Sequence, residues 1–462
     1  MAALRLAQAA AMMDGTLVHG RADIAVCRYN IDSRLTAPGE LFFAVVAARD
    51  GHDFIPQAAE AGAAGAVVSR DVPLPLPDFA LIRVEDTVQA LQRLAARVLA
   101  ERPVRVVGIT GSAGKTTTKE LAAALIAARH RVLKSEGNLN NHLGLALSLL
   151  KLEPGHDIAV LEMAMNHPGE IRALTRIAPP DVAVVINVLP VHLEFFGSVE
   201  DIARAKREIL DGAKPGATAV LNGDEPLVRR MAEGWPGPIV TFGFHDGCRV
   251  RAVAVERRGI EGLAFDLLYG EDRIALRTPF LYESYLLDIL AACGAAFACG
   301  IPAADVAGPI RDFHPFDKRG SLLRLGRGVT LVDESYNSNP RALAGALRGL
   351  AGLPARRKVA VLGDMLELGS HAPIFHEEAG RQAAREGWAP LITVGPLGRR
   401  MAEGALAEGL DASEIASFET PEEAAAAVPD LIRPGDLVLV KGSRGMRLET
   451  VVERLKDLFK EG

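Results

Sequence analysis

The chain has 462 residues, a hydrophobic share of 49% and a formal net charge of −6. This composition is that of an ordinary globular protein, and the length predicts about three domains. The negative charge and the lack of a Lys/Arg run argue against binding to nucleic acid. The apolar stretch 289–304 is too short to span a bilayer and reads as a packed helix, so we expect no membrane insertion.

The four cysteines are scattered and form no CxxC pair, which favours free thiols in a reducing compartment. Three polar residues (Arg5, Gln8, Asp14) interrupt the apolar N-terminus, which disfavours a signal peptide. We therefore expect a cytoplasmic protein that is a monomer.

Apolar runs and turn residues divide the chain into three predicted α/β domains: residues 1–102, 103–311 and 312–462. In the first domain, we expect strands at 41–46 and 66–69 and helices at 54–61 and 87–99. In the central domain, the expected strands are 104–110, 131–135, 157–162, 181–187 and 218–222, followed by a small antiparallel layer within 249–279. In the third, they are 329–333, 357–363, 391–394 and 437–441.

Strands that alternate with helices predict mostly parallel sheets, here a phosphate-loop ATPase-like central sheet and a smaller, Rossmann-like C-terminal one. Ligands of such sheets bind beyond the carboxyl ends of the strands.

The segment 108–120, GITGSAGKTTTKE, joins a predicted strand to a helix expected at 121–127. A glycine-rich turn in this position lets backbone N–H groups and a helix N-terminus converge on phosphate. Lys115 can reach the outer phosphates, and the Thr116 hydroxyl can bind Mg²⁺. An ordinary glycine-rich turn is the alternative, but the strand before and the helix after favour a nucleoside triphosphate site.

Polar side chains follow two further strands at the same predicted edge. Glu162 ends one apolar run, Asn187 ends another, and His192 comes shortly after. Each alone could be a turn former or a solvated side chain. Together at the phosphate-loop edge they favour a Mg²⁺ site, because that ion needs oxygen or imidazole ligands there.

Lys206 shares a helix face with the apolar residues Ile202 and Leu210. Its ammonium could extend to water along the apolar surface. Alternatively, the lysine could be desolvated and partly neutral, and then react with CO₂ to form an anionic carbamate that ligates metal. The pattern alone leaves both readings open.

Motifs along nearly the whole chain resemble the Mur ligase family. They are DSR at 32–34, ELFFA at 40–44, DGH at 50–52, GITGSAGKTTTKE, the asparagines at 138, 140 and 141, VLEMAM at 160–165, INVLPVHLEFFGS at 186–198 and ARAKREI at 203–209. DESYNSNP at 333–340, VLGDMLELG at 361–369 and VKGSRGM at 440–446 look like the family member that adds D-alanyl-D-alanine to a UDP-N-acetylmuramoyl tripeptide.

The resemblance implies a role for each matching residue. The implied catalytic residues are Lys115, His192, Lys206 and Arg319. The implied ATP-binding residues are Thr110, Gly111, Ser112, Ala113, Gly114, Lys115, Thr116, Thr117, Asn141, Asp333 and Glu334. The implied substrate-binding residues are Ser33, Arg34, Asn140, Tyr336, Asn337 and Asn339. The implied metal ligands are Thr116, Glu162, His192 and Lys206 as a carbamate.

The implied activity is an ATP- and Mg²⁺-dependent amide ligation through an acyl phosphate, which gives a UDP-muramoyl pentapeptide for cell-wall synthesis. The alternatives are another Mur-type or a folylpolyglutamate-type ligase, a phosphate-loop kinase or switch, and a nucleotide-binding scaffold without turnover. A guanine switch is disfavoured because the sequence lacks an NKxD motif.

The sequence departs from the family pattern in two places. Ser284, Tyr285 and Asp288 stand where relatives have the His-Asn pair and the last Asn that hold adenine. Tyr285 could stack on the base or be a core aromatic. Glu334 stands where the second acid is usually Asp.

Overall fold

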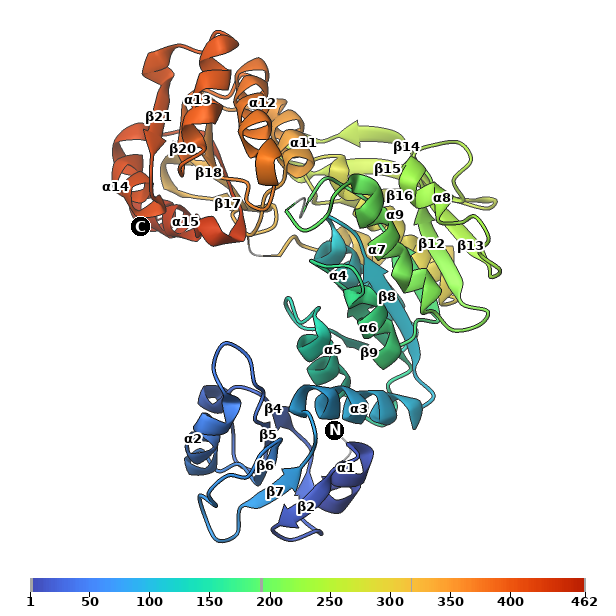
Figure 1. Cartoon of the computed structure of the whole chain (residues 1–462). Coiled ribbons are helices and arrows are strands. Elements are labelled where there is room, and N and C mark those ends of the chain that lie inside the picture. Colours follow the sequence, from blue (N-terminus) through green and yellow to red (C-terminus); the bar gives the residue numbers. More distant parts are fainter. Residues whose placement is uncertain (1–2, 192–193, 317, 461–462) are drawn as a thin grey trace.

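A computed structural model describes residues 3–191, 194–316 and 318–460. Three α/β units follow one another along the chain (Figure 1). This agrees with the predicted three-domain α/β class. No helix in these ranges is both long and apolar enough to cross a bilayer.

The first unit holds a five-stranded sheet in the order β2-β7-β6-β5-β4, parallel except for the β2–β7 pair. Its strands are β2 (Thr16–His19), β4 (Tyr29–Asn30), β5 (Leu41–Phe43), β6 (Gly65–Val68) and β7 (Ala80–Arg83), with β1 (Leu4–Arg5) and β3 (Ala25–Val26) pairing separately. Its helices are α1 (Leu6–Met12), α2 (Ile55–Glu60) and α3 (Thr87–Ala100). Helix α3 contacts α1 and also helices α5 and α6 of the central unit, so its apolar face joins the two cores.

The central unit holds a nine-stranded sheet in the order β16-β15-β14-β13-β12-β11-β8-β10-β9. Its strands are β8 (Arg105–Thr110), β9 (Val132–Lys134), β10 (Ile158–Glu162), β11 (Val182–Val185), β12 (Thr218–Asn222), β13 (Ile239–Gly243), β14 (Val250–Arg257), β15 (Leu263–Tyr269) and β16 (Asp272–Thr278). Its helices are α4 (Lys115–Ile126), α5 (His142–Leu149), α6 (Glu170–Ile177), α7 (Val199–Asp211), α8 (Pro226–Arg230), α9 (Ser284–Ala298) and α10 (Ala307–Asp312).

All pairs among strands β8 to β14 are parallel. The β14–β15 and β15–β16 pairs are antiparallel, as predicted for 249–279. They do not form a separate layer, however, because β14 pairs with β13 and extends the central sheet. Neighbouring residues such as Val106 and Val107 are both fully buried, the first in the core with α5–α7 and the second in the core with α4 and α9. Helices therefore cover both faces, which explains the uninterrupted apolar runs.

The C-terminal unit holds a six-stranded sheet in the order β17-β18-β22-β19-β20-β21, parallel except for the β17–β18 pair. Its strands are β17 (Ser321–Arg324), β18 (Thr330–Glu334), β19 (Lys358–Gly363), β20 (Leu391–Val394), β21 (Ile415–Phe418) and β22 (Leu437–Lys441). Its helices are α11 (Pro340–Ala351), α12 (Ala372–Arg385), α13 (Gly398–Ala407), α14 (Pro421–Leu431) and α15 (Glu449–Leu458).

Candidate functional site

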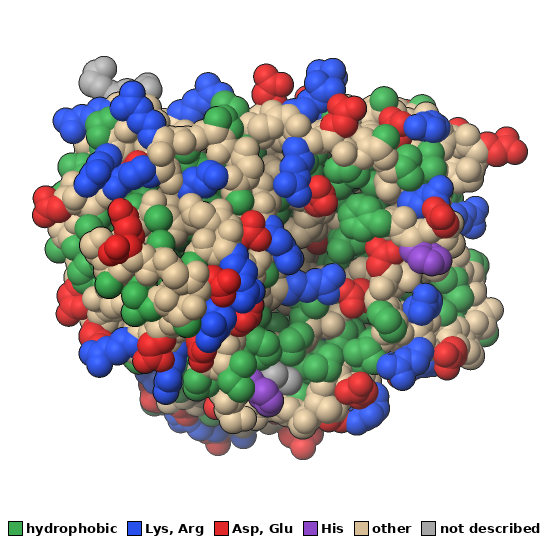
Figure 2. Space-filling view, turned by 90° about the horizontal axis from the view of Figure 1, so that it is seen from above, with side chains coloured by type: hydrophobic (Ala, Val, Ile, Leu, Met, Phe, Trp, Pro, Cys, Tyr) green, Lys and Arg blue, Asp and Glu red, His purple; other side chains and the backbone are tan. Residues whose placement is uncertain are grey.

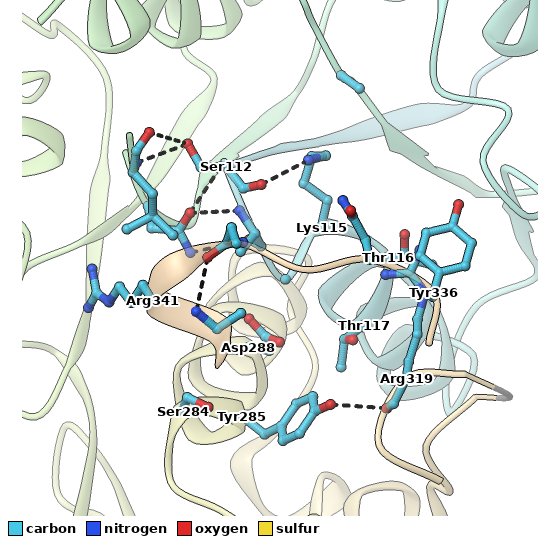
Figure 3. Close-up of a pocket in the computed structure, with 18 of the residues that line it drawn as sticks. Ser112, Lys115, Thr116, Thr117, Ser284, Tyr285, Asp288, Arg319, Tyr336 and Arg341 are labelled. Carbon is cyan, nitrogen blue, oxygen red and sulfur yellow. Dashed lines mark hydrogen bonds between the residues drawn. The ribbon is translucent and has the colours of Figure 1, made fainter. Parts of the chain in front are cut away.

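A cavity of about 370 Å³ lies where the carboxyl edges of the central and C-terminal sheets face each other (Figure 3). Its central-unit wall includes Ser112, Ala113, Gly114, Lys115, Thr116, Thr117, Asn138, Asn140, Glu162, Asn187, Ser284, Tyr285 and Asp288. Its C-terminal wall includes Lys318, Arg319, Glu334, Tyr336, Asn337, Asn339, Arg341 and Lys441. Most of the residues predicted to bind nucleotide therefore meet in one place.

The predicted phosphate loop joins β8 to α4. Gly114 caps α4 with a φ of 79°, and a Cβ atom there would lie 2.0 Å from the Asp288 carboxylate, so the position requires glycine. Asn187 Oδ1 accepts hydrogen bonds from the backbone N–H groups of Ser112 and Ala113, both at 2.9 Å. The first turn of α4 leaves further N–H groups without helical partners, and these can receive an anion.

Lys115 is the first residue of α4, and its ammonium group donates to the Gly111 carbonyl at 2.9 Å. Burial lowers the pKa of Lys115, the Glu162 carboxylate opposes that shift, and the charge of Arg319 adds to it. The loop is therefore partly enclosed, and the positive charges of Lys115 and of Arg319 on the opposite wall lie near one another.

Glu162 lies at the end of β10 and is buried between two donors. The Thr116 hydroxyl donates to its Oε2 and the Asn140 amide to its Oε1, both at 2.8 Å. These bonds fix both carboxylate oxygens at the base of the cavity. His192, predicted as a further ligand, lies outside the described residues.

Lys206 lies on the buried face of α7, which begins after the N-cap Ser198. Only 2% of its surface is exposed, which rules against an ammonium group extended into water. Burial and then the positive charge of Lys115 hold the pKa of Lys206 well below its ordinary value. This shift favours the neutral form of the amine, which the carbamate reading requires.

Arg319 and Tyr336 form the opposite wall. The Arg319 guanidinium lies 3.7 Å from the centre of the Tyr336 ring (Figure 3). Asn337 and Asn339 line the same wall, but Asn339 Oδ1 also caps α11 by accepting from the Ala342 N–H at 2.9 Å. Capping of α11 therefore accounts for the Asn339 side chain without a substrate.

Several predicted binding residues lie outside the cavity wall. Asp333 accepts from the Ser335 N–H and hydroxyl and so shapes the turn after β18. Asn141 caps α5. Thr110 is fully buried in β8, and Gly111 supplies the carbonyl that Lys115 contacts. Local hydrogen bonds therefore account for the side chains of Asp333 and Asn141, whereas the buried Thr110 hydroxyl has no hydrogen-bond partner among the described residues.

Ser33 and Arg34 lie after β4 in the first unit, away from the cavity. The Ser33 hydroxyl donates to Gln57 at 2.8 Å, and Arg34 forms an ion pair with Asp32.

The segment that departs from the family pattern forms the first turn of α9, which begins five residues before the helix expected at 289. Tyr285 stacks on Phe280 with ring centres 4.4 Å apart, and its hydroxyl donates to Glu334 at 2.6 Å. Burial raises the pKa of Asp288 well above its ordinary value, although Arg319 opposes the shift.

The cavity wall also contains residues to which the sequence analysis gave no role, among them Lys318, Arg341 and Lys441. Arg341 forms an ion pair with Glu225 of the central unit. Lys441 could have been found, because it is a charged residue at the end of a buried apolar strand, the same signal that identified Glu162.

Comparisons with known proteins agree with this geometry. Residues 109–296 match the Mur ligase middle domain, and residues 318–444 match the Mur ligase glutamate ligase domain. The UDP-N-acetylmuramoyl-tripeptide--D-alanyl-D-alanine ligase of Bacillus subtilis is 36% identical over 96% of this chain and 97% of its own length.

Two solved structures are also similar. MurF from Acinetobacter baumannii superimposes with a TM-score of 0.90 at 28% identity, covering 99% of both chains. The MurF ligase from Thermotoga maritima in complex with ADP gives 0.81 at 31% identity, covering 93% of this chain and 97% of that one.

The fold and the cavity define an ATP-binding ligase built from three α/β units. The chain belongs to the Mur ligase family. Within that family, the similarity to the D-alanyl-D-alanine-adding ligases extends over nearly the whole chain, which leaves the kinase and switch readings without support.

Proposed function

We propose that this enzyme joins D-alanyl-D-alanine to a UDP-N-acetylmuramoyl tripeptide at the expense of ATP. The terminal carboxylate of the tripeptide attacks the γ-phosphate, the bond between the β- and γ-phosphates breaks, and ADP leaves as an acyl phosphate forms. The amine of the dipeptide then attacks the acyl carbon, and phosphate leaves through a tetrahedral intermediate. The observation that carries the proposal is the similarity, over nearly the whole chain, to ligases of this specificity, combined with a phosphate loop that faces Arg319 across one cavity.

The protein contributes position and charge rather than covalent chemistry. Lys115 and the first turn of α4 bind the outer phosphates, and Arg319 approaches them from the opposite wall. Glu162 is held by Thr116 and Asn140 at the base of the cavity. We propose that Ser33 and Arg34 anchor the uridine nucleotide, and that Tyr336, Asn337 and Asn339 contact the peptide substrates.

The residues at the base of the cavity suit Mg²⁺, which prefers oxygen ligands and keeps several waters and phosphate oxygens. Glu162 and the Thr116 hydroxyl would hold the ion, joined by His192 and a carbamate on Lys206. When bound, Mg²⁺ would neutralise phosphate charge.

We further propose a cytoplasmic monomer with domain limits near residues 102 and 311. The free cysteines of the described chain suit a reducing compartment.

The acceptor amine tests the proposal directly. With ATP and tripeptide, we expect D-alanyl-D-alanine to be coupled at least about tenfold faster than D-glutamate, diaminopimelate or lysine, because a site that binds a dipeptide leaves its polar groups unpaired with a single amino acid. Mass spectrometry of the UDP-muramoyl product, with diaminopimelate- and lysine-containing tripeptides in parallel, measures this. If a single amino acid is coupled faster, the acceptor assignment is wrong even though the ligase chemistry stands.

Base selection should be weak in this enzyme. Tyr285 already uses its hydroxyl on Glu334, and the carboxyl group of Asp288 lacks the two amide N–H donors of an asparagine. We expect kcat/KM with GTP and ITP to lie within about tenfold of the ATP value, since one lost base contact contributes about 1–1.5 kcal/mol. Steady-state phosphate release with the three triphosphates measures this. A preference for ATP above about 100-fold would mean that other groups read the base.

A further inference from the structure

The buried carboxylate of Glu334 receives donors from two domains. Lys441, its partner on the neighbouring strand β22, donates to Oε2 at 2.6 Å. From the central unit, the Tyr285 hydroxyl donates to Oε1 at 2.6 Å, and the Tyr282 hydroxyl donates to the same oxygen. Burial alone would raise the pKa of Glu334, but the charge and hydrogen bond of Lys441 and the bonds from the two tyrosine hydroxyls together lower it, which favours the ionised carboxylate. Its lone pairs serve the protein rather than a ligand.

The Tyr285 hydroxyl also contacts the backbone of Arg319. Its oxygen lies 3.0 Å from the Arg319 carbonyl, so its single proton is shared between that carbonyl and Glu334 (Figure 3). The next residue, Gly320, has a φ of 88°, and a Cβ there would lie 2.6 Å from the Tyr285 oxygen and 3.1 Å from Glu334 Oε1. Glycine at this position therefore permits the close approach.

The two ends of Arg319 are thus fixed separately. Tyr285 contacts its carbonyl, and its guanidinium lies 3.7 Å from the centre of the Tyr336 ring. The guanidinium lies close enough to Lys115 to lower the pKa of that residue. A shift of the Arg319 backbone would therefore change the position of the positive charge that faces the phosphate loop.

We propose that Tyr285 and Glu334 are positioning residues for the ligase reaction: their interdomain hydrogen bond sets where the Arg319 guanidinium stands relative to the phosphate loop. The inference rests on the proposed role of this cavity in phosphoryl transfer. It also unites the two departures from the family pattern, because the tyrosine at 285 and the longer acid at 334 contact each other. Burial raises the pKa of Tyr285 well above its ordinary value, and Glu334 adds to the shift, so the hydroxyl remains a donor.

Tyr285→Phe removes only the hydroxyl and keeps the ring stacked on Phe280. We expect kcat for pentapeptide formation to fall about tenfold while KM for D-alanyl-D-alanine stays within about twofold, because misplacement of a charge affects the transition state more than dipeptide binding. The losses of kcat caused by Glu334→Gln and Tyr285→Phe should be less than multiplicative in the double variant, because the two changes share the hydrogen bond between these residues. Tyr269→Phe is the matched control, since that ring stacks on Phe297 in the same unit away from the cavity.

Hydrogen exchange gives a readout that does not need turnover. In the ligand-free enzyme, the peptide that covers residues 318–324 should exchange at least about threefold faster in Tyr285→Phe than in wild type or Tyr269→Phe. An active wild type with unchanged kcat and exchange in Tyr285→Phe would overturn the inference, as would a loss of kcat that only follows a lower Tm. A wild-type enzyme that forms no pentapeptide would instead overturn the proposed function, and the exchange measurement would still decide whether Tyr285 holds Arg319.

Discussion

Lys115→Ala is expected to lower kcat by about 100-fold or more, because it removes a positive charge aimed at the transferred phosphoryl group inside a partly enclosed site. Steady-state phosphate release in the presence of both peptide substrates measures the effect. Lys115→Arg should recover little activity, since the planar guanidinium cannot take the place of a compact ammonium group folded against the Gly111 carbonyl.

Folding should survive the Lys115 substitution. The side chain is half-buried and bonded to its own loop. Removing it takes away a desolvated charge, so the loss of one hydrogen bond is offset and we expect Tm to change by only a few degrees. Lys151→Met, which breaks an ion pair with Glu136 at the surface, is the control for loss of a lysine and should keep full activity. Near-normal turnover of Lys115→Ala would refute the ATP-site assignment.

The strands of the central sheet were predictable because helices cover both of its faces. Residues 218–222 were predicted as a strand and form β12. The start of α4 was placed six residues too late, since its first turns read KTTTKE and look solvated. In the structure, Thr118 and Lys119 are fully buried, and Lys119 donates to the Ser135 carbonyl at 2.6 Å. A polar segment of this kind cannot be recognised as buried without the segments that pack against it, such as the one that receives the Lys119 hydrogen bond.

The phosphate-loop half of the site was predictable because its residues are contiguous and the strand–turn–helix context is local. The other half depends on which strands become neighbours. Lys441 meets Glu334 only because β22 inserts between β18 and β19, an order that the sequence does not reveal. Short strands such as β4, with two residues, carry too little pattern to be predicted.

Lys206→Met should abolish most turnover while leaving the fold at least as stable as wild type. Methionine keeps the volume of the buried side chain and removes a group whose charged form is unfavourable in that place. We expect kcat to fall by about 100-fold or more, on the scale of losing one charged group from a preorganised site, and Tm to stay equal or rise. Lys206→Ala should also lose turnover, with some loss of stability from the cavity it leaves. Phosphate release and thermal unfolding measure the two effects.

Arg204→Ala is the matched control, because Arg204 lies on the exposed face of the same helix and pairs with Asp201. It should change neither turnover nor Tm appreciably. Lys206→Arg should not restore activity, since a guanidinium that never loses its proton cannot react with CO₂. Carbon-13 NMR with labelled bicarbonate should give a carbamate signal in wild type and in Arg204→Ala but not in Lys206→Met. An active Lys206→Arg enzyme, or the same carbamate signal in Lys206→Met, would mean that Lys206 serves the site as a cation or not at all.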